Sequence, residues 1–503
     1  MGSHGYLLGY DIGSSSVKAS LLETASGAPV ASATSPSTEL EISAPRPGWA
    51  EQRPATWWEH VKKTTAMILE ESRVDSAEIG AIGISYQMHG LVIVDKDGEV
   101  LRPSIIWCDS RAVPFGEKAM KEIGEEKCLR HLLNSPGNFT AAKLAWVKEH
   151  EPDVYRRIHK IMLPGDYIAM KLTGRLVTTP SGVSEGIMWD FPAGDVAGFL
   201  LDYFGFDRDF LPEIVPTFSE QGRIGAGAAE ELGLKKGTPV SYRGGDQPNN
   251  ALSLNVLNPG EVAATAGTSG VVYGVADRPV SDSLSRVNTF VHVNYSKDCP
   301  RYGVLLCVNG TGILNSWVKH NLMSGEGAAP DYRRMDESAA EAPVGSEGLV
   351  VLPYGNGAER TLGNRSLGGV VHGLDFNTHS RVHFLRAVQE GIVFALNYGV
   401  EIMRGTGAAV EKVRAGNANM FISPVFREAF ATVTGAELQL YETDGAQGAA
   451  RGAGIGAGIY KDAHEAFKGL GTTCTVGPSR SSREAYREAY GRWSEVLSRN
   501  MSQ

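Results

Sequence analysis

The stretch that decides the fold is residues 6–22, YLLGYDIGSSSVKASLL, in which a turn of small residues separates two apolar runs. This order predicts a β-hairpin with Gly13, Ser14 and Ser15 in its turn. Glycine leaves backbone N–H groups uncovered, and serine hydroxyls add further donors. Such a turn can bind an anion, and we expect that anion to be phosphate.

A second stretch of the same kind lies half a chain later. Residues 262–273, VAATAGTSGVVY, again place a turn of small residues, here with Gly267 and Thr268, between two apolar runs. One phosphate-binding hairpin in each half predicts a duplicated fold that holds a polyphosphate between its halves.

Length supports a division into two domains. The chain has 503 residues, and a single hydrophobic core rarely serves more than roughly 250. The segment Asn258-Pro259-Gly260 should interrupt regular structure. We therefore expect an N-terminal domain at residues 1–255 and a C-terminal domain at residues 256–503.

Charge and cysteine content exclude several classes of protein. The net charge is −9 and no basic run occurs, which argues against nucleic acid as a partner. No apolar run approaches the roughly 20 residues that a membrane span needs. Five cysteines without a CxxC pair fit a reduced cytosolic protein. A soluble cytoplasmic protein is the expectation.

The apolar periodicity predicts strands at the start of each half, with helices after them. Residues 116–173 are expected to be mostly helical, and the small-residue run 448–460 is expected to form a helix. The predicted fold class is therefore α/β. The expected strands are residues 6–10, 17–22, 28–34 and 79–85 in the first half, and 261–264, 271–274, 289–294 and 303–308 in the second.

Two acidic residues are candidates for chemistry. Asp246 follows an apolar strand and the pair Gly244-Gly245, so a ligand could approach closely, and its carboxylate could accept a hydroxyl proton during phosphoryl transfer. It could equally cap the helix that begins near Pro248. Asp11 precedes the first turn, where a carboxylate could hold Mg²⁺ through water or accept hydrogen bonds within that turn.

Three further segments are candidates for ligand binding. Residues 87–90, Gln-Met-His-Gly, interrupt two apolar strands and could bind a polyol, or form a polar loop with a core histidine. Residues 107–111, Trp-Cys-Asp-Ser-Arg, could bind a sugar or hold a surface ion pair. Residues 415–419, Ala-Gly-Asn-Ala-Asn, could admit a flat adenine or form a simple turn.

Taken together, these segments resemble the FGGY family of carbohydrate kinases, and within it the xylulokinases, over roughly residues 7–460. The resemblance is carried by markers in a characteristic order. They are DIGSSSVK (11–18), GWAEQ (48–52), QMHG (87–90), TAAKLAW (140–146), GGD (244–246), GTSG (267–270) and GAERT (357–361).

The resemblance implies two domains of the actin/hexokinase type (ribonuclease H-like), with ATP and Mg²⁺ in a cleft between them. Asp246 matches the general base, and Asp11 matches the acid that holds Mg²⁺ through water. The sugar would contact Gln87, Met88, His89, Trp107, Asp109, Asp246 and Gln247. The nucleotide would contact Gly13, Ser14, Ser15, Lys18, Gly267, Thr268, Gly312, Gly416 and Asn419.

Three positions depart from the family pattern. Gln247 stands where xylulokinases usually have Asn, so recognition of a hydroxyl beside the base is open. The adenine turn is Ala-Gly-Asn-Ala instead of Gly-Gly-Gly-Ala. The segment Gly-Glu-Arg-Thr-Pro appears as Gly-Ala-Glu-Arg-Thr-Leu at residues 357–362.

The expected activity is ATP-dependent phosphorylation of a ketopentose, D-xylulose to D-xylulose 5-phosphate. Alternatives are the same chemistry on ribulose, fuculose or glycerol, a sugar-binding regulator without turnover, and an actin-like ATPase that assembles. The expected partners are a small sugar and ATP, without nucleic acid or membrane. A homodimer is left open.

Overall fold

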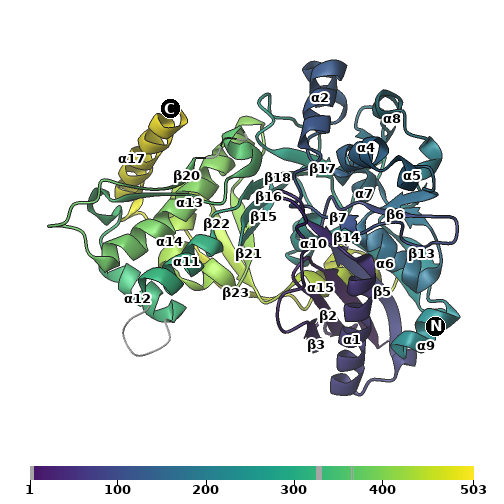
Figure 1. Cartoon of the computed structure of the whole chain (residues 1–503). Coiled ribbons are helices and arrows are strands. Elements are labelled where there is room, and N and C mark those ends of the chain that lie inside the picture. Colours follow the sequence, from purple (N-terminus) through teal and green to yellow (C-terminus); the bar gives the residue numbers. More distant parts are fainter. Residues whose placement is uncertain (1–4, 324–330, 364, 366, 503) are drawn as a thin grey trace.

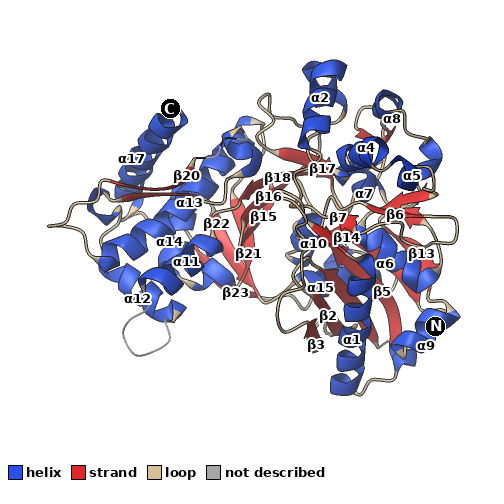
Figure 2. Ribbon diagram, viewed as in Figure 1, coloured by secondary structure: helices blue, strands red, loops and turns tan. Residues whose placement is uncertain are grey.

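The fold is known from a computed structural model, which describes residues 5–323, 331–363, 365 and 367–502. Helices and strands alternate along the chain, and two mixed sheets form its two halves (Figures 1 and 2). The first sheet has the strand order β13-β14-β5-β1-β2-β3, and the second has the order β17-β18-β16-β15-β21-β22-β23. The α/β fold class is therefore confirmed.

The first sheet is built around the predicted hairpin. β1 (Tyr6–Ile12) pairs antiparallel with β2 (Val17–Glu23) and parallel with β5 (Ile79–Tyr86). The remaining strands are β3 (Pro29–Ser35), β14 (Pro239–Gly245) and the antiparallel edge strand β13 (Phe218–Arg223).

The second sheet repeats this arrangement. β15 (Glu261–Ala266) pairs antiparallel with β16 (Gly270–Ala276) and parallel with β21 (Lys412–Gly416). The other strands are β17 (Asn288–Val291), β18 (Tyr302–Val308), β22 (Glu437–Tyr441) and the antiparallel β23 (Thr472–Val476). From β18 to β23 the order and directions match those from β3 to β13, so the structure shows the predicted duplication.

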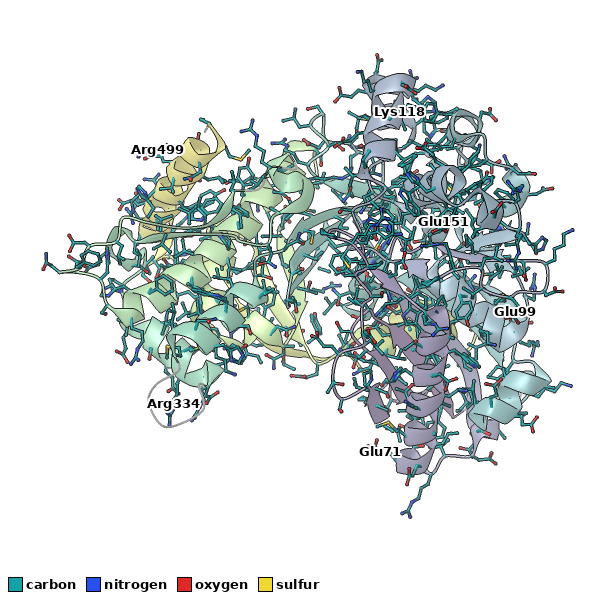
Figure 3. The ribbon with its side chains drawn as sticks, viewed as in Figure 1. Glu71, Glu99, Lys118, Glu151, Arg334 and Arg499 are labelled. Carbon is teal, nitrogen blue, oxygen red and sulfur yellow. The ribbon has the colours of Figure 1, made fainter. Side chains whose placement is uncertain are left out.

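Helices cover both sheets. α1 (Pro54–Ser72) packs on β2 and β3, and its buried residues join the core of the first sheet. α13 (Arg381–Gly405), α14 (Pro424–Thr434) and α17 (Arg483–Met501) enclose the core of the second sheet. Glu71 of α1 and Arg499 of α17, both labelled in Figure 3, are exposed near the ends of these helices.

The helix of small residues returns to the first sheet. α15 (Gly445–Gly456) packs on β1, β5 and β14. A Cβ atom at Gly9 or Gly83 would stand 1.9 Å from a carbonyl oxygen of α15, of Ala446 or Ala449 respectively. Only glycine permits this approach. Any division of the chain at residue 255 therefore leaves one helix of the second half on the first sheet.

Residues 91–215 form additional structure beside the first sheet. α2 (Val113–Ile123), α3 (Glu125–His131), α4 (Thr140–His150), α6 (Pro164–Thr173) and α7 (Pro180–Glu185) lie here. Within residues 116–173, which were expected to be mostly helical, the segment 156–159 is not helical, because α5 (Pro152–Tyr155) ends there and β8 (Lys160–Met162) then pairs with β6 (Val92–Val94). One buried cluster joins this region to β16, β17 and β18 of the second sheet.

Candidate active site

Asp246 is the first residue of α10 (Asp246–Ser253), directly after β14, and Gly245 is the N-cap of that helix. Burial and the nearby Asp11 carboxylate raise the pKa of Asp246 to about 7. A carboxylate with this pKa can accept a proton at neutral pH. The two glycines before it let neighbouring chain pack closely, since a Cβ atom at Gly245 would stand 2.6 Å from Met88 Cγ.

Asp11 lies near the end of β1, where its Oδ1 accepts a hydrogen bond of 2.8 Å from the Ser85 hydroxyl. Burial raises its pKa, the Ser85 hydroxyl and Lys18 lower it, and Asp444 raises it. Lys18 is the partner of Asp11 across the hairpin. The Asp11 carboxylate in turn raises the pKa of Asp246, and carboxylates this close together form a site that favours a cation.

The residues present fit a Mg²⁺ ion of the kind that keeps most of its water. Such an ion needs only one or two carboxylates together with phosphate oxygens, and Asp11 and Asp246 supply two. Within the described ranges, no group of three or more His, Cys, Asp or Glu side chains is arranged to hold a metal ion.

Hydrogen bonds from neighbouring segments fix the turn of the first hairpin. Gly13 N–H donates to the Ser16 carbonyl at 3.0 Å, and Gln52 Nε2 donates to the Ser14 carbonyl at 2.7 Å. The Leu40 N–H donates to the Ser15 carbonyl. Trp107, which is 40% exposed, donates from Nε1 to Ser14 Oγ. This contact brings one expected sugar residue beside the expected phosphate turn.

In the second half, the residues expected to bind the nucleotide contact one another. The N–H of Gly312, the first residue of α11 (Gly312–Leu322), donates to the Gly267 carbonyl at 2.8 Å, and the Ile313 N–H donates to the Thr268 carbonyl. Asn419 Nδ2 would lie 3.5 Å from a Cβ atom at Gly267. Gly416 ends β21, next to the turn that carries exposed Asn419.

The segment at the end of β5 carries the expected sugar residues. Gln87 and Met88 are buried, and Gln87 Nε2 donates to Gln52 Oε1. His89 is half-buried, with its ring edge-on to Phe139 at 4.7 Å between centroids. Burial lowers the pKa of His89 to about 3, so its imidazole is neutral at physiological pH.

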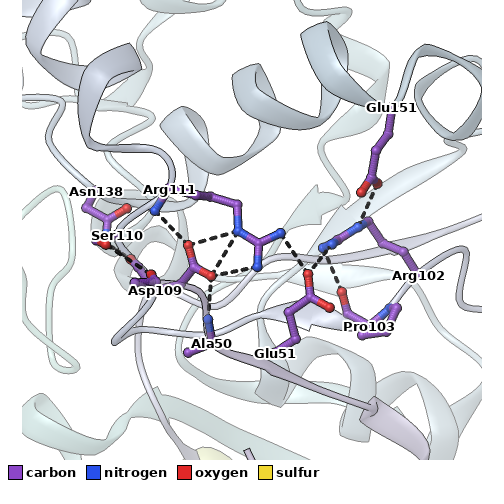
Figure 4. A network of polar contacts seen from close by, with 10 residues as sticks. Ala50, Glu51, Arg102, Pro103, Asp109, Ser110, Arg111, Asn138 and Glu151 are labelled. Atoms are coloured by element: carbon purple, nitrogen blue, oxygen red, sulfur yellow. Dashed lines mark hydrogen bonds and ion pairs between the residues drawn. The ribbon is translucent and has the colours of Figure 1, made fainter. Parts of the chain in front are cut away.

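Asp109 and Trp107 differ in placement although only one residue separates them. Asp109 is fully buried, and its carboxylate accepts from Ala50 N–H and from the Arg111 guanidinium. Figure 4 shows the network continuing through Glu51 to Arg102 and Glu151. The ion pair of Asp109 with Arg111 is thus internal, where the sequence had suggested a surface pair as one option. Half-buried Gln247 lies next to the base.

Two buried charged residues at this site were missed by the sequence reasoning. Glu185 ends α7 and is fully buried, with 0% of its surface accessible. Lys143 in α4 is also 0% accessible, and its Nζ donates to the His89 carbonyl at 2.8 Å. Burial lowers the pKa of Lys143 to about 7. Lys143 stood inside the marker TAAKLAW, which was the one available signal.

Among the described residues, no helix combines the length and the hydrophobicity that a bilayer crossing requires. The described contacts bring Asp11, Asp246 and Met88 together around the ends of β1, β5 and β14, and they bring the turn at Gly267 against the start of α11 in the second half.

Known proteins resemble the chain over nearly its whole length. The xylulose kinase of Escherichia coli (strain K12) is 29% identical over 500 residues, which cover 97% of this chain and 99% of that protein. The solved xylulose kinase from Rhodospirillum rubrum is 28% identical, with a TM-score of 0.86 and 98% of both chains covered. A gluconate kinase structure from Lactobacillus acidophilus, at 23% identity, shares the fold with a TM-score of 0.89 over 99% and 98% of the two chains.

Family comparison accounts for both halves. The N-terminal domain of the FGGY family of carbohydrate kinases matches residues 6–253, and the C-terminal domain of the same family matches residues 262–459. Both hairpin turns, Asp11 and Asp246 lie inside these ranges, whereas the edge strand β23 of the second sheet lies beyond them. The chain therefore belongs to the FGGY family of carbohydrate kinases.

Proposed function

We propose that this carbohydrate kinase transfers the γ-phosphoryl group of ATP to a ketopentose, converting D-xylulose to D-xylulose 5-phosphate. The observation that carries the proposal is the contact between the base and the sugar-facing segment. Gly245, which precedes Asp246, packs against Met88, and the neutral imidazole of His89 follows Met88 directly. The xylulose kinases named above support the choice of sugar.

In the proposed reaction, the terminal hydroxyl of the sugar gives its proton to the Asp246 carboxylate. The hydroxyl oxygen forms a bond to the γ-phosphorus as the bond to the β–γ bridging oxygen breaks, so ADP leaves. The hairpin turns at Gly13 and Gly267 offer backbone donors to the phosphates. Mg²⁺, bound through water near Asp11, would neutralise charge that develops on the phosphoryl oxygens.

The presence of Gln247 beside the base keeps other polyols as alternative candidates for the sugar substrate. An Asn-to-Gln change beside the base adds one methylene to the side chain, which moves the amide relative to the sugar hydroxyls. Ribulose, fuculose, glycerol and gluconate therefore belong in the same test as xylulose.

The test is a coupled assay of ADP release against this panel, with kcat/KM as the measured quantity. We expect xylulose to give the highest value. A higher value for another sugar would refute xylulose as the substrate while leaving the kinase activity in place. Phosphorus–proton couplings in the NMR spectrum of the product would show which hydroxyl carries the phosphate. Asp246→Asn serves as the control without a base.

A further inference from the structure

The residue that links the base to the sugar-facing segment is Glu185. It ends α7, the short helix that packs on β14 and on β17. Its neighbour Ser184 accepts a hydrogen bond of 2.9 Å from the Val291 N–H in β17. Helix α7 is thus fixed to the second sheet through Ser184, while the next residue, Glu185, faces the first sheet.

Glu185 holds His89 by two separate groups. Its Oε1 accepts from the His89 backbone N–H at 3.4 Å, and its own carbonyl oxygen hydrogen-bonds with His89 Nδ1 at 2.9 Å. Lys143 completes the arrangement, because its Nζ donates to the His89 carbonyl. Both polar groups of the His89 backbone and one ring nitrogen are therefore bound by residues of α7 and α4.

His89 has the left-handed conformation, with φ of 63°. This conformation is strained for a residue with a side chain, and it persists only where the surroundings enforce it. In the extended conformation of the preceding strand the imidazole would follow the alternation of β5. The enforced turn is what directs the ring toward Phe139 and Phe290.

We propose that Glu185 is a positioning residue for the sugar: with Lys143 it holds His89 in the left-handed conformation, and its second carboxylate oxygen sets the spacing between His89 and the strand that carries the base. The inference rests on the proposed function and deepens it. It assigns sugar affinity to a residue that lies behind the site and touches neither substrate.

The second carboxylate oxygen supports the spacing role. Glu185 Oε2 is buried beside the strand that carries the base, since a Cβ atom at Gly245 would stand 2.4 Å from it, and the Tyr86 hydroxyl at the end of β5 also acts on this carboxyl. Burial and the Asp246 carboxylate raise the pKa of Glu185 well above its ordinary range.

The test uses two variants of Glu185 and one matched control. Glu185→Ala removes the side-chain acceptor, and Glu185→Gln keeps an acceptor of the same size. Glu390→Gln alters another buried carboxylate, on α13 of the second half, which accepts hydrogen bonds from Gly345 N–H and Arg386. The sugar is whichever member of the panel the wild-type chain phosphorylates with the highest kcat/KM, so a wrong choice of xylulose leaves the test intact.

We expect Glu185→Ala to raise KM for the sugar about tenfold, as for one lost buried hydrogen bond, with KM for ATP unchanged. Glu185→Gln should restore most of the affinity. The Glu390→Gln control should leave both KM values unchanged. A lowered melting temperature with wild-type KM for the sugar in Glu185→Ala would overturn the proposal.

A second variant decides the matter if Glu185→Ala does not fold. Lys143→Met removes the donor to the His89 carbonyl and keeps the length and apolar body of the side chain. A selective rise in sugar KM supports the clamp on His89, and an unchanged sugar KM in a folded Lys143→Met protein overturns it. Loss of turnover on every sugar, in contrast, would count against the proposed function.

Discussion

The Asp11 carboxylate lies directly against Gly445: a Cβ atom at position 445 would stand 2.6 Å from Asp11 Oδ2. These residues are the end of the first strand and the start of α15, which the chain reaches only after crossing the second sheet. The helix N-terminus carries partial positive charge, so it stabilises the ionised form of the acid that faces it.

Gly445→Ala is expected to displace the Asp11 carboxylate and to lower kcat by a factor on the order of 10², the size of effect that misplacement of a reacting group by about 1 Å produces. Gly491→Ala is the control, because nothing lies within 4 Å of a Cβ atom there. Steady-state kinetics and a melting curve for both variants test this, and wild-type kcat in Gly445→Ala would contradict it.

Asp11→Asn should lower turnover and raise the Mg²⁺ concentration needed for half-maximal rate, because the amide has no negative charge to attract the hydrated ion. The hydrogen bond from Ser85 can be kept by the amide oxygen. A titration of initial rate with Mg²⁺ measures the effect. A normal rate with unchanged Mg²⁺ dependence would assign Asp11 to the turn alone.

The raised pKa of Asp246, about 7, predicts the pH dependence of kcat/KM. Below pH 7 the carboxyl is protonated in the free enzyme and cannot accept the hydroxyl proton, so kcat/KM should fall about tenfold per pH unit. Above pH 7 it should level off. Asp246→Asn should lower kcat by a factor of about 10² to 10⁴ and should abolish the fall of kcat/KM below pH 7. If the variant keeps the wild-type kcat and the same fall below pH 7, Asp246 is not the base.

The sequence predicted the parts of the site that short motifs carry. The two hairpins and the strand-end positions of Asp11 and Asp246 come from segments that were recognisable one at a time. Gly312 was named only through the family resemblance, and its contact with Gly267 was not predicted. Glycine-rich turns and acids at strand ends have local signatures, because backbone geometry restricts which residues can stand there.

The parts that escaped prediction depend on long-range packing. Glu185 sits in the run PSGVSEG, whose composition is typical of a loop, and nothing local marks its carboxylate as buried. The run 448–460 indicated a helix of small residues, but its placement on Gly9 and Gly83 is a property of the folded chain. The helix also starts earlier, at Gly445, because Asp444 caps it by accepting from the Gln447 N–H.

Gly312→Ala is expected to weaken the nucleotide site selectively. A Cβ atom at Gly312 would stand 2.3 Å from the Gly267 carbonyl oxygen, so the helix start and the second turn must separate and lose their hydrogen bond. KM for ATP should rise about tenfold, with KM for the sugar unchanged. Gly227→Ala, where a Cβ atom would meet open space, is the control, and equal ATP KM values in the two variants would refute the assignment.

His89 gives the last prediction, which separates a ligand-binding histidine from a core histidine. His89→Ala removes the ring that packs against Phe139 and Phe290. It should raise KM for xylulose about tenfold or more, because a site built to bind a hydroxyl loses a polar partner. His89→Asn keeps a polar side chain and tolerates the left-handed backbone better, so it should retain more sugar affinity than the alanine variant. KM for ATP should be unchanged in both. Thermal melting supplies the deciding comparison: a large fall in melting temperature with wild-type KM for xylulose would mean that the histidine serves the core.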